Sequence, residues 1–336
     1  MLNKIRGGMN MSKVIKTAVT EKLGIKYPIF QGGMAWIVNA EMVAAVANAG
    51  GLGILPSGTC ADAEHLRSEL KKIKELTDKP YAVNFTFMPS LANVDYPSYL
   101  KVCIEEGVKI IETSGMPAKP PLMEAMKKAG MIVIHKCTTV KHALKAQSIG
   151  CDMVVADGCE CAGHSGETDI GSIVLTPRCV EELSIPVITA GGIANGKQMA
   201  AALMMGADGV YLGTRMLLTK ECPVLDKVKD YLAENADETC TSYLLRAFRN
   251  TTRLYKSNVV KEALEKEKAG CEFADIAEAV AGVTAKKMFY ENGDVENCGV
   301  ISYGQAGGLI HSVISIQEVM DSMMAECIES LGRFDA

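Results

Sequence analysis

The sequence lacks the charge and leader patterns that mark several classes of protein. Its formal net charge is −5 and no block of Lys or Arg stands out, which argues against a nucleic-acid partner. The opening MLNKIRGGMN has no apolar core and so does not predict a signal peptide. The most apolar stretch, residues 198–219, is interrupted by Asp208, Arg215 and three glycines, so it does not predict a membrane span. We therefore expect a soluble, cytoplasmic protein that binds neither nucleic acid nor membranes.

Short motifs for metals and dinucleotides are missing as well. No GxGxxG fingerprint is present, so a pyridine nucleotide would have no Rossmann domain of its own here. The twelve cysteines contain no CxxC pair and no paired ligand spacing for zinc, so no metal site is predicted. Without a secretory signal, the cysteines are expected to be reduced and mostly buried rather than joined in disulfides.

The sequence does contain a repeated strand-helix rhythm. With 336 residues, 48% of them hydrophobic and 22% charged, it is long enough for one large domain or for a barrel with a smaller domain. Apolar runs alternate with helical stretches, and eight such units predict a parallel (β/α)8 TIM barrel. The eight runs are PIFQGG, GLGILPSG, YAVNFTF, VKIIETSG, MIVIHKC, DMVVADG, PVITAGG and GVYLGTR.

Polar residues at the strand ends are candidates for the working face, because such barrels carry their chemistry there. The strand that stops at Asp157 leads into a loop in which glycines flank His164. Asn84 stands inside an apolar run and Lys136 near a strand terminus, where lysine is unusual. Two ordinary explanations remain open: Asn84 as a hydrogen-bonded core residue, and His164 as a loop residue that caps local structure.

Glycines follow several of these strands. Gly32 and Gly33 let a ligand approach the backbone after the first strand. AGG ends the seventh strand and LGT the eighth, and this pair of loops commonly forms the phosphate site of such barrels. The phosphate candidates are Gly191, Gly192, Gly213 and Thr214. Tight turns without a ligand are the alternative.

The rhythm stops near Thr219, which suggests a second unit. We expect an N-terminal extension over residues 1–20, the barrel over 21–218, a small charged helical domain over 219–300 and a return helix on the barrel over 301–336. Gln305 and Gly307 are expected to come back toward the barrel mouth and the substrate. A homodimer formed through the helical segment is a further expectation.

Several other residues have ordinary explanations. We expect solvated loop positions at the acidic residues Glu160, Glu167 and Asp169 and at Ser165 between them. We expect packing roles for Trp36 and Tyr211. The remaining histidines lie on charged helical faces or favour structural roles; they are His65, His135, His142 and His311.

Taken together in this order, a set of motifs resembles one family, the FMN enzymes grouped around nitronate monooxygenase (2-nitropropane dioxygenase). The motifs are YPIFQGGMAW, ANAGGLGIL, LTDKPYAVN, the GHSG of CAGHSG, IPVITAGGIANG, ADGVYLGTR and GQAGGLI. They cover nearly the whole chain. IHKCTTVKHALKA, ECAGHSGETDI, LRAFRNTTR and FADIAEAVAG are most similar to the NADH:quinone reductase branch, near the flavin-type enoyl-acyl-carrier-protein reductases. Gln31-Gly32-Gly33-Met34 departs from the QAPM-like element of nitronate oxidases.

The resemblance implies a bound FMN. Its phosphate would lie at Gly191, Gly192, Gly213 and Thr214, and its ring against the backbone of Gly32, Gly33 and Met34. Asn84, Lys136, Asp157 and Gly163 would line the ring or the ribityl chain, and a positive Lys136 would favour the anionic reduced cofactor. His164 matches the catalytic loop histidine, which would orient or protonate the substrate.

The resemblance implies an oxidoreductase that takes hydride from NADH or NADPH and passes it by ping-pong transfer to a quinone or another conjugated carbonyl. Two alternatives in the same family are a nitronate monooxygenase that uses O2 and an enoyl-thioester reductase. An alternative of another class is a barrel without flavin, either a sensor of a phosphorylated metabolite or an isomerase or aldolase.

Overall fold

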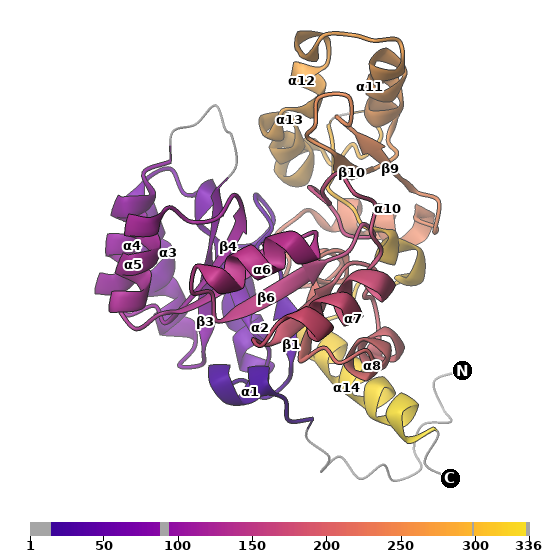
Figure 1. Ribbon diagram of the computed structural model, residues 1–336. Coiled ribbons are helices and arrows are strands. Elements are labelled where there is room, and N and C mark those ends of the chain that lie inside the picture. The colour runs from indigo at the N-terminus through magenta and orange to yellow at the C-terminus, as the bar shows by residue number, and fades with distance from the viewer. Residues whose placement is uncertain (1–14, 88–93, 298, 334–336) are drawn as a thin grey trace.

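The eight predicted strands lie side by side in one parallel sheet, in the order β1-β8-β7-β6-β5-β4-β3-β2 (Figure 1). The structure is a computed structural model that describes residues 15–87, 94–297 and 299–333. The strands are β1 (Ile29–Gln31), β2 (Gly53–Pro56), β3 (Tyr81–Phe87), β4 (Ile110–Gly115), β5 (Ile132–Cys137), β6 (Met153–Asp157), β7 (Val187–Ala190) and β8 (Gly209–Leu212). Each lies within the run that predicts it.

Gln31 closes the sheet between β1 and β2. The backbone amides of Gln31 and Leu52 donate to Leu52 O and Ile29 O, both at 2.9 Å. Beyond them, Gln31 Oε1 accepts from Ile54 N at 3.2 Å and Gln31 Nε2 donates to Ile54 O at 3.4 Å. This fully buried amide thus replaces a backbone pair where the two strands diverge. The (β/α)8 TIM barrel is thereby confirmed.

Helices cover the outside of the sheet, and their ends follow capping signals in the sequence. Asn39, for example, begins α2 as predicted, because its Oδ1 accepts from Met42 N at 3.0 Å. The helices of the barrel are α2 (Ala40–Asn48), α3 (Ala63–Leu76), α4 (Tyr96–Glu105), α5 (Pro120–Lys128), α6 (Val140–Ser148), α7 (Ser172–Glu182), α8 (Gly196–Met204) and the short α9 (Thr214–Leu217).

The inside of the barrel is apolar in its lower part. Inward side chains form one cluster, among them Phe30, Ile110, Ile134 and Ile188. Val19 and Leu23 of α1 (Ala18–Leu23) join it, and α1 lies at the end of the barrel opposite residues 236–297 (Figure 1). The helix α1 therefore fills the end of the barrel at which its strands begin.

The segment after the barrel differs from the expected helical domain at one place. Thr241–Leu244 (β9) and Thr252–Tyr255 (β10) form an antiparallel pair, with Thr252 opposite Leu244 and Tyr255 opposite Thr241. These strands have no apolar run, so their sequence resembles an amphipathic helix. Their β-branched and aromatic residues form strands because partners elsewhere in the chain pair with them.

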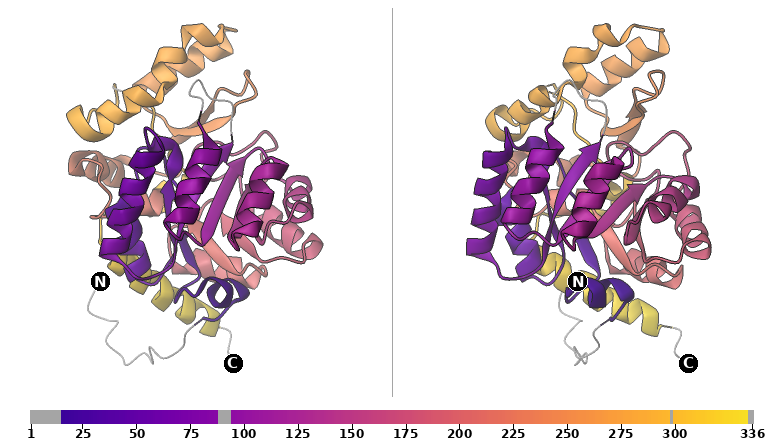
Figure 2. Two further views of the ribbon diagram at one scale, coloured as in Figure 1. Left: turned by 90° about the vertical axis from the view of Figure 1, so that its left-hand side faces the viewer. Right: turned by 60° about the vertical axis from the view of Figure 1, so that its left-hand side comes forward.

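The other elements of this segment are helical, and those of residues 258–287 lie above the strand ends (Figure 2). They are α10 (Asp226–Asn235), α11 (Asn258–Lys268), the 3-10 turn η2 (Phe273–Asp275), α12 (Ala277–Val280), α13 (Gly282–Lys287) and the π-helical turn η3 (Met288–Asn292). We refer to residues 236–297 as the cap. Finally, α14 (Ile316–Gly332) packs against α8 and α2 on the side of the barrel.

In the part of the chain that the structure describes, no helix is long and apolar enough to cross a membrane. The cysteines in the same part are all free, as the sequence predicts.

Candidate active site at the barrel mouth

The inward side chains change from apolar to polar near the carboxyl ends of the strands. Two residues beyond Ala82, Ile110, Ile134 and Val155, the same strands place polar groups inside the barrel, and β8 adds one more. This ring of polar residues consists of Asn84, Glu112, Lys136, Asp157 and Tyr211. It lies directly above an apolar layer, so its charges are held in a poorly solvated environment.

Lys136 and Asp157 form an ion pair in this ring, with Lys136 Nζ 3.0 Å from Asp157 Oδ2. The Asp157 side chain is 3% exposed, whereas 25% of the Lys136 side chain remains accessible at the mouth. Burial by itself lowers the pKa of Lys136, but the facing Asp157, Tyr211 and Glu112 raise it more, so the net pKa lies above its usual range. Lys136 is therefore a permanent positive charge that faces the mouth.

Glu112 was not predicted as a site residue. It has no exposed surface, accepts a hydrogen bond from Asn84 Nδ2, and lies 3.5 Å from Tyr211 OH, which donates to it. Burial raises the pKa of Glu112 to about 7, although Lys136 and Asn84 oppose the shift. The available signal was a charged residue inside the apolar run VKIIETSG, the kind of signal that pointed to Asn84 and Lys136.

The glycines after β1 lie against this ring. Gly33 N donates to Tyr211 OH at 3.0 Å, and a Cβ on Gly33 would lie 2.9 Å from Asn84 Cβ. Any larger residue would displace Asn84. The half-buried Met34 follows, and its carbonyl accepts from Ile37 N at 3.2 Å. The residues that were predicted to contact the ring of the cofactor come from the turn after β1, from β3 and from β5, and the structure brings these three places together.

The predicted phosphate residues follow β7 and β8, the next strands of the sheet. Gly191 and Gly192 have φ values of +95° and +76°, which favour glycine. A Cβ on Gly213 would meet no atom closer than Met34 Sδ at 3.9 Å, so space is open beside this turn. Thr214 Oγ1 accepts from Gly304 N at 2.9 Å, which ties the turn to the C-terminal segment.

A buried cation, Arg215, follows Thr214 in the chain. Arg215 is 6% exposed, and its Nη2 donates to Leu218 O and, at 2.9 Å, to Ser312 O. Within the described ranges it has no carboxylate partner. Burial lowers the pKa of Arg215 to about 10, so the guanidinium remains charged at neutral pH. The glycine amides of these turns suit an anion such as a phosphate, and the carboxylate of Glu160 lies beside Gly191.

The acidic residues of the His164 loop are paired rather than only solvated. Both carboxylate oxygens of Glu160 accept from Ser172 N at 2.9 Å, at the start of α7, and a Cβ on Gly191 would lie 3.2 Å from Glu160 Oε2. Glu167 Oε1 accepts from Thr251 N at 2.9 Å. Asp169 forms a two-point ion pair with Arg246, at 2.6 and 2.8 Å. The last two contacts join the loop to the cap.

The cap strand β10 pairs with this loop directly. Gly163 N donates to Arg253 O at 3.0 Å and Arg253 N to Gly163 O at 2.8 Å. The Arg253 side chain donates from Nε to Cys159 O at 2.9 Å and lies 4.1 Å from the centre of the Tyr243 ring. Tyr243 OH also donates to Cys159 O at 2.9 Å. Sequence reasoning missed both residues because it did not predict the hairpin.

His164 follows Gly163 and is exposed at the mouth. The protein packed around the imidazole and the charge of Lys136 lower the pKa of His164 below its usual value, although Asn250 and Glu167 act in the opposite direction. His164 is therefore mainly neutral at pH 7. Its response to Lys136 indicates that the two residues share one electrostatic environment.

The other predicted positions lie close by or have structural contacts. Gln305 is exposed, and its backbone amide donates to Glu160 O at 3.0 Å, next to the His164 loop. Gly307 is buried beneath the ring of Tyr303, which leaves no room there for a side chain. His135 is buried with its Nδ1 2.7 Å from Thr113 Oγ1, which agrees with a structural role.

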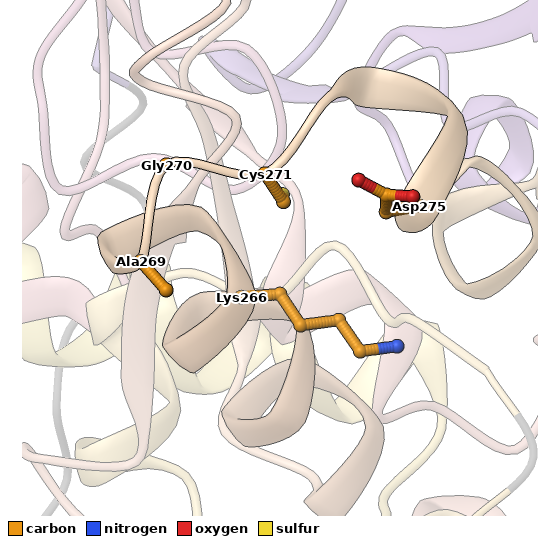
Figure 3. Close-up of a pocket in the computed structure, with 5 residues that line it drawn as sticks. All are labelled: Lys266, Ala269, Gly270, Cys271 and Asp275. Atoms are coloured by element: carbon orange, nitrogen blue, oxygen red, sulfur yellow. The ribbon is translucent and has the colours of Figure 1, made fainter.

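An open hollow in the cap does not belong to this site. It is lined by Lys266, Ala269, Gly270, Cys271 and Asp275, from the end of α11 to η2 (Figure 3). None of the predicted site residues lines it, and it lies away from the strand ends.

The features at the mouth fit the cofactor that the sequence implies. Open space beside Gly213 and the charge of Arg215 suit a phosphate, and the fixed cation Lys136 suits an electron-accepting ring. Gly213 follows β8 and Lys136 lies on β5, so both stand at the carboxyl ends of the barrel strands.

Comparison with known proteins assigns the chain to a family. The family model for nitronate monooxygenase matches residues 16–326. The chain is 33% identical to the (3aS,4S,5R,7aS)-5-hydroxy-7a-methyl-1-oxo-octahydro-1H-indene-4-carboxyl-CoA dehydrogenase of Rhodococcus jostii, over 96% of the chain and 98% of the relative. It is also 33% identical to a probable nitronate monooxygenase of Staphylococcus saprophyticus, over 66% of the chain and 74% of that protein.

Solved structures agree with this assignment. FabK from Thermotoga maritima superimposes with a TM-score of 0.87 at 30% sequence identity, over 96% of this chain and 99% of that one. A nitroalkane oxidase from Streptomyces ansochromogenes, at 24% identity and a TM-score of 0.81, shares the fold. The chain therefore belongs to the nitronate monooxygenase family of oxidoreductases, whose members are flavoproteins and generally depend on FMN.

Proposed function

We propose that the protein is an FMN-dependent oxidoreductase that takes hydride from NADH or NADPH and passes it to a conjugated carbonyl acceptor such as a quinone. One observation carries the proposal: a fixed cation, a glycine turn with open space beside it and a neutral histidine all stand at the carboxyl ends of the barrel strands. A bound flavin supplies the redox chemistry, since it accepts and releases a hydride. The absence of a GxGxxG fingerprint supports a nucleotide that binds only transiently.

The residues of the chain would divide the remaining work. Gly191, Gly192, Gly213 and Thr214 would hold the phosphate through their amides, helped by the charge of Arg215. Lys136 would stabilise negative charge at the ring, because Asp157 fixes its position and raises its pKa. His164, neutral at pH 7, would donate a hydrogen bond from its ring N–H to the carbonyl of the acceptor.

An anaerobic titration of the purified flavoprotein tests this proposal. Addition of NADH or NADPH is expected to bleach the flavin absorbance, and addition of a quinone is then expected to restore it. If neither nucleotide bleaches the flavin, the proposal fails.

Two other reactions have support from particular relatives. The family model and the staphylococcal relative favour a nitronate monooxygenase, which a nitronate would reduce and O2 reoxidise while NADH and NADPH have no effect. Similarity over the whole chain to a carboxyl-CoA dehydrogenase favours an acyl thioester as the conjugated carbonyl. Loss of the double bond of a crotonyl thioester in the presence of NADH or NADPH would select that substrate class.

A further inference from the structure

Glu112 is a buried acid at the candidate cofactor site that the proposed function does not use. Its carboxylate is one hydrogen bond from Asn84 and one from Tyr211, and Tyr211 in turn accepts from the amide of Gly33. Asn84 and Gly33 are both residues expected to contact the ring. Glu112 is therefore separated from the mouth by a single layer of side chains.

The charges around Glu112 come from three other strands. Lys136 on β5 is positive, Asp157 on β6 is negative, and Tyr211 on β8 is neutral, because burial raises its pKa above the usual range. If Glu112 is ionised, two carboxylates face one ammonium group; if it is protonated, one carboxylate faces one ammonium group. A further negative charge at the mouth would favour the protonated form, since like charges in a poorly solvated site repel strongly.

We propose that Glu112 is a proton-exchanging positioning residue of this site, which binds a proton from solvent when reduction brings negative charge to the barrel mouth and releases it when that charge leaves. The exchange has a simple balance. The reductant supplies two electrons, the cofactor takes up its own proton from solvent equally in the wild type and in Glu112→Gln, and one additional solvent proton forms an O–H bond with a carboxylate oxygen of Glu112. The inference depends on the flavin of the proposed function and is independent of the hydride donor.

The test is the pH dependence of the flavin midpoint potential, measured with dithionite as reductant. Above about pH 7, where Glu112 is largely ionised in the oxidised protein, the wild type is expected to bind one more proton per two electrons than Glu112→Gln. One proton per two electrons corresponds to about 30 mV per pH unit, from the two-electron constant. Equal slopes in the two proteins would overturn the inference.

Glu106→Gln is the matched control. Glu106 stands at the end of α4, just before the strand that carries Glu112, but pairs with Arg67 and Lys74 on the outside of the barrel. It is expected to keep the wild-type slope, and a slope that falls as in Glu112→Gln would count against a specific role of Glu112.

A second measurement needs no variant. An infrared difference spectrum between the reduced and oxidised wild-type protein is expected to gain the carbonyl stretch of a protonated carboxyl group, and its absence would overturn the inference even if Glu112→Gln fails to fold. The titration with dithionite can show the extra proton even if neither NADH nor NADPH bleaches the flavin. In that case the proposed hydride donor is wrong, and the role of Glu112 is still supported. A protein that retains no flavin overturns both.

Discussion

At the scale of single residues, the polar ring combines charges whose protonation differs from that of free side chains. Lys136 stays charged because Asp157 lies 3.0 Å away, whereas Glu112 has no ion-pair partner among the residues that the structure describes and keeps its proton to a higher pH. A buried acid with a raised pKa makes stability depend on pH, even without a cofactor.

Glu112 is expected to reduce the stability of the apoprotein as the pH rises. Its folded pKa of about 7 lies above the value of about 4.3 for an unfolded Glu, so its contribution is complete below about pH 4 and is lost as the pH rises through about 7. Relative to Glu112→Gln, the free energy of unfolding of the wild type should fall by at most about 3 kcal/mol over this range. Urea unfolding of both proteins at several pH values measures it, and parallel profiles would contradict the assignment.

Gly213 offers a way to separate cofactor binding from folding. Gly213→Ala adds a methyl group to open space 3.9 Å from Met34 Sδ, so the unfolding free energy of the apoprotein should change by less than about 0.5 kcal/mol. If the phosphate occupies that space, the Kd for FMN should rise about tenfold or more, which is about 1.4 kcal/mol.

Flavin fluorescence titration measures the Kd of the Gly213→Ala protein. Gly58→Ala is the control, because a Cβ on Gly58 also meets open space but lies outside the predicted phosphate turns. If the Kd for FMN is the same in Gly213→Ala and in the wild type, the phosphate does not bind at this turn.

At the scale of secondary-structure elements, the hairpin β9–β10 holds the His164 loop. Gly163 and Arg253 form an isolated antiparallel bridge between the loop and the hairpin, and Arg253 and Tyr243 both donate to Cys159 O. The cap therefore contributes to the position of the histidine.

Arg253→Met is expected to loosen this loop. It removes a charged donor to Cys159 O, a contact worth about 1.5–3 kcal/mol, while the apolar stem of the side chain is retained. Amide hydrogen exchange measured by mass spectrometry should become faster over residues 158–167. The fall in kcat, expressed as an activation free energy, should exceed the fall in the free energy of unfolding. Arg246→Met is the control, because the half-exposed Arg246–Asp169 pair should contribute only up to about 1 kcal/mol. Equal exchange in both variants would show that Arg253 does not hold the loop.

These elements also show what the sequence could and could not predict. The strands of the barrel are buried on both sides, so each leaves a continuous apolar run such as YAVNFTF. The hairpin leaves none, because Arg253 and Tyr243 pair with the loop more than 80 residues earlier in the chain. Likewise Asn84 and Lys136 were recognisable one by one. Their convergence with Glu112 and Tyr211 depends on closure of the barrel, which no local pattern encodes.

At the scale of the whole molecule, the cap and the barrel are joined on two sides of the mouth. On one side is the loop-hairpin pairing. On the other, Tyr290 OH donates to Trp36 O at 2.6 Å, and Lys286 Nζ lies 5.0 Å from the centre of the Trp36 ring. Trp36 has a φ of +63°, an unusual value for a bulky residue, so its surroundings must hold it there. It lies two residues after Met34 and thus links the cap to the predicted ring site.

Because Trp36 is the only tryptophan in the chain, its fluorescence reports this contact alone. If contacts on both sides make the cap and the barrel one cooperative unit, urea should change the Trp36 emission and the far-ultraviolet circular dichroism with the same midpoint. Tyr290→Phe removes one hydrogen bond, worth about 1 kcal/mol, and should shift both midpoints down together. An emission change at lower urea than the circular dichroism change would mean that the cap detaches first, and in Tyr290→Phe that gap should then widen.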